Sequence, residues 1–215
     1  MSVPLIIDLW GDVVCPFCYL GTHQLHLALE RFEHREHIII RHHAFELDPG
    51  TSRDEQRTLD EVLAAKYSMP LERARTLNRR VEDDAAALGM TWSLANARVT
   101  NTFDAHRVIA LALDQERGEA MVERLYRAYF SEGELVSDHA TLIRLAREVG
   151  VRGAEHLFTT DDFAQRVRAD EAAAQELGIS GVPAFVIDQK FMVVGAQGAD
   201  QLVSVLERAW TRRGV

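Results

Sequence analysis

The chain has few cysteines, no long apolar run and no excess of positive charge. Only two of its 215 residues are cysteine, and both lie in one short stretch, unlike the scattered structural cysteines of many exported proteins. No segment approaches the roughly 18 consecutive apolar residues of a membrane span. The N-terminus shows neither a basic leader nor a small-residue cleavage site. We therefore expect a cytoplasmic protein.

The charge balance is acidic. Lys and Arg number 24 against 33 Asp and Glu, which gives a formal net charge of -9. Without a basic stretch, this balance argues against nucleic acid and anionic membrane surfaces as partners. With 47% hydrophobic and 27% charged residues, the composition is that of a soluble globular protein with one large domain or two small ones.

The two cysteines form a C-x-x-C motif in which Pro16 and Phe17 separate Cys15 from Cys18. A branched apolar run, Pro4–Trp10, precedes the motif and predicts a strand. Apolar residues at helical spacing follow it in Gln24–Phe32. The cysteines are therefore predicted to lie at a strand-to-helix joint.

That position favours redox chemistry. The first turn of a helix offers unpaired backbone N–H groups and the positive end of the macrodipole, which stabilise Cys15 as a thiolate. Pro16 suits the first helical turn, where its missing N–H is not needed. Cys18 lies one turn further in, close enough for a disulfide and less open to solvent. We therefore predict that Cys15 is the attacking thiol and Cys18 the resolving one.

Strand patterns lie on both sides of a long helical segment. The pattern of residues 37–47 predicts a second strand. In almost every segment from Thr58 to about Leu177, by contrast, the apolar residues have helical spacing. Two short strands and a final amphipathic helix follow, in residues 181–188, 191–195 and 200–213. The order predicts an α/β fold, β-α-β then β-β-α, with a large all-α insertion. The expected division is residues 1–50 and 178–215 for the α/β part, and residues 51–177 for the insertion.

These features resemble the DsbA family, which has a thioredoxin-like fold with a helical insertion. Four separated motifs, Trp10–Gly21, Asn101–Arg107, Ile179–Phe185 and Gly195–Gln197, look most like the cytoplasmic FrnE-like branch. The resemblance implies a thiol-disulfide oxidoreductase or isomerase that acts on protein or peptide disulfides. It would be recycled by a glutathione or thioredoxin type of system. No metal or organic cofactor is required, and glutathione is the co-substrate to consider.

The resemblance also implies a role for Val182 and Pro183. Pro183 would be cis and pack beside the dithiol, which leaves the backbone of Val182 to pair with an extended substrate peptide. An edge backbone of this kind holds a peptide by main-chain hydrogen bonds and gives broad recognition.

Other residues near the motif are candidates for supporting roles. Phe17 supplies no positive charge and Asp12 adds a negative one, so we expect a Cys15 thiolate less strongly stabilised than that of DsbA. Asp8, in the middle of the apolar strand, either accepts the proton of Cys18 from a buried position or lies half-exposed at the surface. Trp10 is a candidate for an apolar groove that binds unfolded substrate, although aromatic residues at such spacing are usually core.

The predicted insertion contributes three further candidates. Phe103 is a further aromatic residue of the candidate groove, together with Tyr19 and Trp92. Asn101 lies where glutathione-dependent relatives place some glutathione contacts. His106 lies in a segment that the resemblance places over the active site, but a helical histidine is more often a packed or surface group.

Three other functions are compatible with parts of the sequence. The C-x-x-C motif is also half of a zinc site, which would need two more ligands. The kappa-class glutathione transferases and 2-hydroxychromene-2-carboxylate isomerases share the fold but normally carry serine at the position of Cys15. A holdase or adaptor would bind unfolded chains through the insertion and use the dithiol only as an anchor.

Overall fold

The computed structural model describes residues 4–53, 55 and 57–213, and these form two compact units. The first, an α/β unit, combines the described residues up to Leu47 with those from Val167 onward, and the second, a helical unit, is Asp48–Arg166. The mixed α/β architecture with a helical insertion is as predicted. The elements of the α/β unit are β1 (Leu5–Gly11), α1 (Pro16–Arg31), a 3₁₀ turn (Arg35–His37), β2 (Ile38–Ala44), most of α8 (Ala164–Glu176), β3 (Ala184–Ile187), β4 (Phe191–Val194) and α9 (Ala199–Thr211).

The strands of the α/β unit form one sheet in the order β2-β1-β3-β4. β1 runs parallel to β2, as the intervening helix α1 requires, whereas β3 is antiparallel to both β1 and β4. The register places Trp10 beside His43 of β2 and beside Ala184 of β3. β1 is therefore an interior strand, and it leads directly into the cysteine motif.

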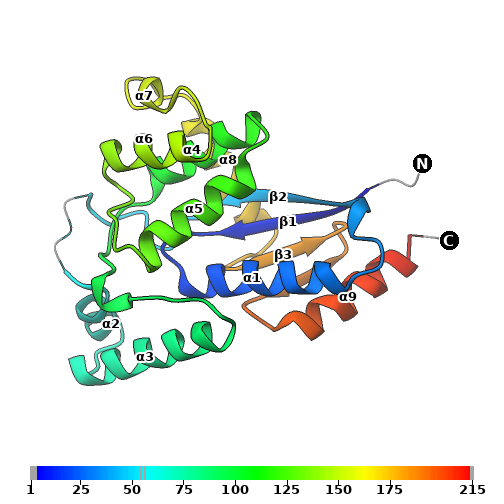
Figure 1. Ribbon diagram of the computed structural model, residues 1–215, viewed down its shortest axis with the longest axis horizontal. Helices are drawn as coiled ribbons and strands as arrows, with labels where there is room; N and C mark the ends of the chain where they lie inside the picture. The colour runs from blue at the N-terminus through cyan, green and yellow to red at the C-terminus, as the bar shows by residue number, and fades with distance from the viewer. Residues whose placement is uncertain (1–3, 54, 56, 214–215) are drawn as a thin grey trace. The chain divides into compact units, whose positions relative to one another are not determined.

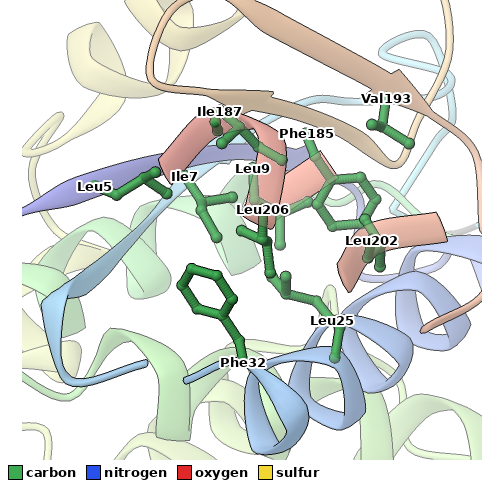
Figure 2. Packing of buried hydrophobic residues seen from close by; sticks show 12 residues of the cluster. Leu5, Ile7, Leu9, Leu25, Phe32, Phe185, Ile187, Val193, Leu202 and Leu206 are labelled. Atoms are coloured by element: carbon green, nitrogen blue, oxygen red, sulfur yellow. The ribbon is translucent and has the colours of Figure 1, made fainter. Parts of the chain in front are cut away.

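One face of the sheet packs against α1 and α9, which lie alongside each other (Figure 1). Alternate residues of β1 point to this face because side chains alternate along a strand. Figure 2 shows them meeting apolar side chains of both helices. The buried cluster includes Leu5, Ile7 and Leu9 of β1, Leu25 of α1, Phe32, Phe185 and Ile187 of β3, Val193 of β4, and Leu202 and Leu206 of α9.

The other face of the sheet packs against α8. Trp10, Ala184 and Val186 form a second buried cluster with Ala174 of α8 and with Ile179. This packing corrects the predicted end of the insertion. Residues 167–177 have a helical pattern and were expected in the insertion, but the apolar side of α8 is buried against the sheet. The α/β unit therefore has three layers, with helices on both faces of the sheet.

The helical unit has a core of its own, which contains aromatic residues. Phe130 stacks on Trp92 with ring centroids 4.9 Å apart and meets Tyr129 edge to face. None of the helices in the described part of the chain has the length and apolar character that a bilayer span needs. The elements are α2 (Leu59–Lys66), α3 (Leu71–Ala87), a 3₁₀ turn (Leu94–Asn96), α4 (Phe103–Asp114), α5 (Gly118–Phe130), α6 (His139–Glu148), the unpredicted four-residue α7 (Ala154–Leu157) and the start of α8.

Candidate active site

The cysteine motif lies at the joint between β1 and α1, as predicted. Cys15 is the N-cap of α1, and Pro16 is the first helical residue. The carbonyl of Cys15 accepts hydrogen bonds from the N–H groups of Cys18, at 3.0 Å, and Tyr19, at 3.3 Å. The Cys15 side chain is therefore attached at the N-terminal end of the helix, which is the positive end of the helix dipole.

Both cysteines are free thiols, and both are buried. The exposed fraction is 3% for Cys15 and 1% for Cys18. Cys18 is therefore the less open of the two thiols, as predicted, although Cys15 is also buried. Phe17, between them, is 48% exposed and is the most exposed residue of the motif.

The environment of Cys18 favours the protonated thiol. Burial raises its pKa well above the ordinary value, and the hydrogen bond and charge of Cys15 act in the same direction. The Asp12 carboxylate also raises it by its charge, whereas the backbone N–H of Asp12, 3.4 Å from the Cys18 sulfur, lowers it. Cys18 is thus a thiol at neutral pH and becomes a nucleophile only after it loses its proton.

Asp12 also shapes the turn that carries Cys15. Its carbonyl accepts a hydrogen bond from the N–H of Cys15 at 3.1 Å. Its carboxylate, buried with the rest of the residue, accepts one from the N–H of Leu47 at 2.8 Å. The predicted supporting residue is therefore in contact with both cysteines through its backbone.

Val182 and Pro183 lie beside Cys15, although 167 residues separate Val182 from it in the sequence. The Cys15 thiol is 3.7 Å from the carbonyl oxygen of Val182, which accepts its hydrogen bond. The Val182–Pro183 peptide bond is cis, as the resemblance implies. The carbonyl of Pro183 accepts a hydrogen bond from Gly195 at 2.7 Å. The structure therefore brings together Cys15, Cys18, Asp12, Val182 and Pro183.

Trp10 is not part of a substrate groove. It is 4% exposed, stacks on His43 with ring centroids 4.3 Å apart, and donates its indole N–H to the carbonyl oxygen of Asp170 at 3.0 Å. The expectation that Trp10 contacts substrate is corrected, because α8 covers the face of the sheet to which the indole points.

Asp8 takes part in a charged cluster between β1, β2 and α8. The two ring nitrogens of His43 each lie 2.8 Å from a carboxylate, Nε2 from Asp8 and Nδ1 from Asp170. Asp170 also accepts a hydrogen bond from the N–H of Ala44 at 3.0 Å. The carboxylate of Asp8 is thus bound to His43. Its proposed role as proton acceptor for Cys18 stays a prediction.

The cluster makes stability depend on pH. Burial acts to lower the pKa of His43, but the hydrogen bonds and charges of Asp170 and Asp8 outweigh it, so the pKa is raised. A raised histidine pKa contributes stability that is complete below the unfolded value, about 6.5, and is lost as pH rises through the folded value. We expect the free energy of unfolding to fall as pH rises from about 6.5 through the folded pKa of His43. His43→Asn should remove this fall.

Urea unfolding at a series of pH values measures the effect. His156→Asn, which changes an exposed histidine of α7, is the matched control and should keep the wild-type pH dependence. Equal pH dependence in wild type and His43→Asn would contradict the prediction.

The remaining predicted site residues, Asn101, Phe103 and His106, belong to the helical unit. The side-chain oxygen of Asn101 accepts the N–H of Phe103 at 3.1 Å, at the start of α4. His106 is buried in α4. Their roles in binding substrate or glutathione stay predictions.

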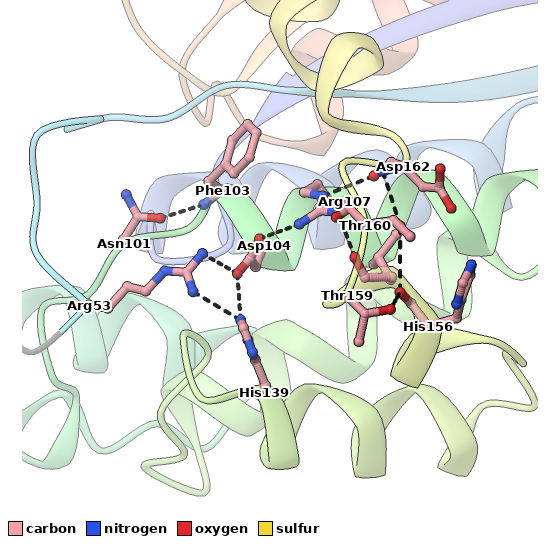
Figure 3. A network of polar contacts seen from close by, with 11 residues as sticks. Arg53, Asn101, Phe103, Asp104, Arg107, His139, His156, Thr159, Thr160 and Asp162 are labelled. Carbon is pink, nitrogen blue, oxygen red and sulfur yellow. Dashed lines mark hydrogen bonds and ion pairs between the residues drawn. The ribbon is translucent and has the colours of Figure 1, made fainter.

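The helical unit contains an ion-pair network centred on two buried side chains, Asp104 and Arg107, the second of which follows His106 in the sequence (Figure 3). The Asp104 carboxylate accepts hydrogen bonds from Arg107 at 2.9 Å and from His139 at 2.6 Å, and it pairs with Arg53. Burial acts to raise the pKa of Asp104, but hydrogen bonds from His139 and Arg107 and the charges of Arg53 and Arg107 lower it. Sequence analysis named His106 as a candidate site residue, whereas the residue that pairs with Asp104 in this network is its neighbour Arg107.

In the part of the chain that the structure describes, no three His, Cys, Asp or Glu side chains are grouped so that they could hold a metal ion. The C-x-x-C motif therefore has no described residues that would complete a zinc site of the usual four ligands.

Comparison with known proteins places this site in a family. Residues 6–207 match the family model described as DSBA-like thioredoxin domain. A probable DsbA oxidoreductase from Streptomyces coelicolor is 34% identical, with a TM-score of 0.92 over 96% of this chain and 90% of that one.

Two more distant structures share the fold. The cytosolic disulfide reductase DsbM from Pseudomonas aeruginosa is 18% identical, with a TM-score of 0.66 over 96% of this chain and 98% of that one, and it has also been solved with glutathione. A 2-hydroxychromene-2-carboxylate isomerase is 19% identical, with a TM-score of 0.72 over 97% and 98%. The match along nearly the whole chain, with a dithiol at the start of α1 and a cis-proline beside it, shows that the chain belongs to the family of DSBA-like thioredoxin domains.

Proposed function

We propose that the protein is a thiol-disulfide oxidoreductase that exchanges protein or peptide disulfides through Cys15 and Cys18. The observation that carries the proposal is the pair of thiols in unlike surroundings. Both thiols are buried, but Cys15 caps the N-terminus of α1, whereas the pKa of Cys18 is raised. One thiol is therefore suited to attack, and the other stays protonated until it is needed.

The reaction proceeds in two exchanges. The Cys15 thiolate attacks one sulfur of the substrate disulfide, which forms a mixed disulfide and releases the other sulfur as a thiolate. Cys18 then loses its proton and attacks the Cys15 sulfur. This forms the Cys15–Cys18 disulfide and releases the second substrate thiolate. The substrate disulfide gains two electrons, the enzyme dithiol loses them, and the reverse sequence oxidises a substrate dithiol.

The substrate is an extended peptide. The Val182 backbone lies beside the Cys15 sulfur, at 3.7 Å through its carbonyl, so a peptide that pairs with this backbone would place its disulfide at the attacking thiol. Main-chain pairing of this kind tolerates many side chains. The exposed Phe17 ring adds an apolar contact next to the dithiol.

Glutathione is the proposed recycling thiol. Two molecules would reduce the Cys15–Cys18 disulfide and leave as glutathione disulfide. The support is the similarity to DsbM, which binds glutathione in one of its structures. The equilibrium reduction potential against glutathione decides the direction of electron flow, because values near -270 mV are typical of thioredoxin and values near about -120 mV of DsbA.

We also propose a cytoplasmic location and a place in the FrnE-like branch. The support is the set of four motifs in the sequence, together with the similarity to a disulfide reductase described as cytosolic. A fractionation experiment on cells that express the untagged protein tests the location.

The proposed function predicts many turnovers per protein molecule. The reduced protein, with glutathione in excess, should reduce insulin and refold scrambled ribonuclease catalytically, and the Cys15→Ser variant is the matched control. A single stoichiometric round, or binding of unfolded chains without exchange, would favour the holdase or adaptor. Glutathione-dependent conversion of 2-hydroxychromene-2-carboxylate without disulfide turnover would favour the isomerase.

A further inference from the structure

Gly21 lies inside α1, five residues after the helix begins, where glycine is unfavourable. In a helix interior it costs up to about 1 kcal/mol relative to alanine. Its backbone is not left-handed, so its conformation does not require glycine. The presence of glycine at this position is therefore to be explained by the atoms that pack against it.

The missing side chain of Gly21 makes room for Pro183. A Cβ atom at this position would lie 2.8 Å from Cγ of Pro183 and 3.2 Å from Cζ of Phe185. Carbon atoms in ordinary contact lie about 3.5–4.0 Å apart, so the proline ring would have to move by roughly 0.7 Å or more. Neither partner can turn aside easily, because the proline ring is stiff and Phe185 is fully buried in the core.

This contact connects the two halves of the site. Cys18 precedes Gly21 by three residues on α1, so the two lie on the same side of the helix. Val182 precedes Pro183, and its carbonyl is 3.7 Å from the Cys15 sulfur. The distance between α1 and Pro183 therefore sets the distance between the dithiol and the backbone of Val182.

We infer that Gly21 is a positioning residue for the exchange of peptide disulfides. Because it lacks a side chain, Pro183 approaches α1 closely, and this holds the Val182 backbone where a bound peptide presents its disulfide to Cys15. The inference rests on the proposed function. It adds that Gly21 contributes to the reaction with peptides and not to the chemistry of the thiols themselves.

Two substrates distinguish these contributions. A small disulfide such as 2-hydroxyethyl disulfide reaches Cys15 without pairing with Val182, whereas a peptide disulfide needs that pairing. The measurement is the single-turnover rate constant with which the reduced protein reacts with each. In Gly21→Ala, the rate constant with the peptide should fall about ten-fold, since a misplacement of 1 Å can cost about 100-fold and a smaller one costs less. The rate constant with the small disulfide should stay at the wild-type value.

Gly181→Ala is the matched control. It makes the same change near the same segment, but nothing lies within 4 Å of the added Cβ. It should therefore leave both rate constants unchanged. If Gly21→Ala does not fold, Gly21→Ala with Phe185→Leu removes the contact at 3.2 Å and keeps the one with Pro183. This double variant should then show the peptide defect, with Phe185→Leu alone as its reference.

Three results would overturn the inference. The first is a Gly21→Ala variant that reacts with the peptide disulfide at the wild-type rate. The second is an equal fall of its rate constants with the peptide and the small disulfide. The third is a folded double variant that reacts with the peptide as fast as Phe185→Leu. Failure of the proposed function looks different, because wild type itself would then react with neither disulfide.

Discussion

Replacing Cys18 by serine is expected to stop turnover and to leave the protein joined to its substrate through Cys15. The first exchange needs only the Cys15 thiolate, whereas release needs a second sulfur nucleophile. Serine cannot supply one, since its hydroxyl does not attack a disulfide at neutral pH. Mass spectrometry of the non-reduced protein, after incubation with a peptide disulfide, should show one peptide adduct per chain.

Cys15→Ser is the matched variant and should behave differently. It keeps the buried Cys18 thiol, whose raised pKa leaves little thiolate at neutral pH. Its exchange should therefore be no faster than the uncatalysed reaction, with no adduct. An adduct on Cys18 in this variant, or catalytic turnover by Cys18→Ser, would show that the two roles are assigned wrongly.

The raised pKa of Cys18 makes the rate of the second exchange depend on pH. Only the thiolate of Cys18 attacks, so the rate of release should rise about ten-fold for each pH unit below the folded pKa. In wild type, rapid quenching with acid at successive times separates formation of the mixed disulfide from its decay. A decay rate that is independent of pH would contradict a protonated Cys18.

The dithiol could be predicted from the sequence because its signals are local. The apolar run of β1, the proline after Cys15 and the helical spacing after Cys18 each act within a few residues. The contact between Cys15 and Val182 is not local, and it was anticipated only through the resemblance to a family. The cis bond at Pro183 was anticipated in the same way.

Packing partners could not be predicted in this way. Asp170 lies in an alanine-rich helix, and nothing near it in the sequence indicates that it meets His43. Trp10 could line a groove or fill a core, and only the position of α8 decides between these. Gly21 carries a local signal, a glycine inside a predicted helix, but the sequence does not name Pro183 as its neighbour.

Replacing Arg107 by methionine is expected to destabilise the helical unit by about 3–5 kcal/mol, the usual cost of removing one partner from a buried charge network. The Arg107 side chain is 7% exposed and pairs with Asp104. It also donates to three backbone carbonyls, those of Leu157 at 2.6 Å, Thr160 at 2.5 Å and Asp162 at 2.9 Å. Methionine fills a similar volume but removes the ion pair and all three hydrogen bonds, and it leaves the Asp104 carboxylate, which is 3% exposed, without its buried partner.

Urea unfolding followed by circular dichroism measures this loss, and Arg147→Met is the matched control. Arg147 forms an ion pair with Glu155, but both side chains are largely exposed, so its replacement should cost no more than about 1 kcal/mol. Similar losses of stability in the two variants would contradict the prediction, because the buried ion pair would then contribute no more than the exposed one. A large loss in Arg107→Met alone would show that this arginine holds the turn after α7 against α4, which no local pattern in the sequence indicates.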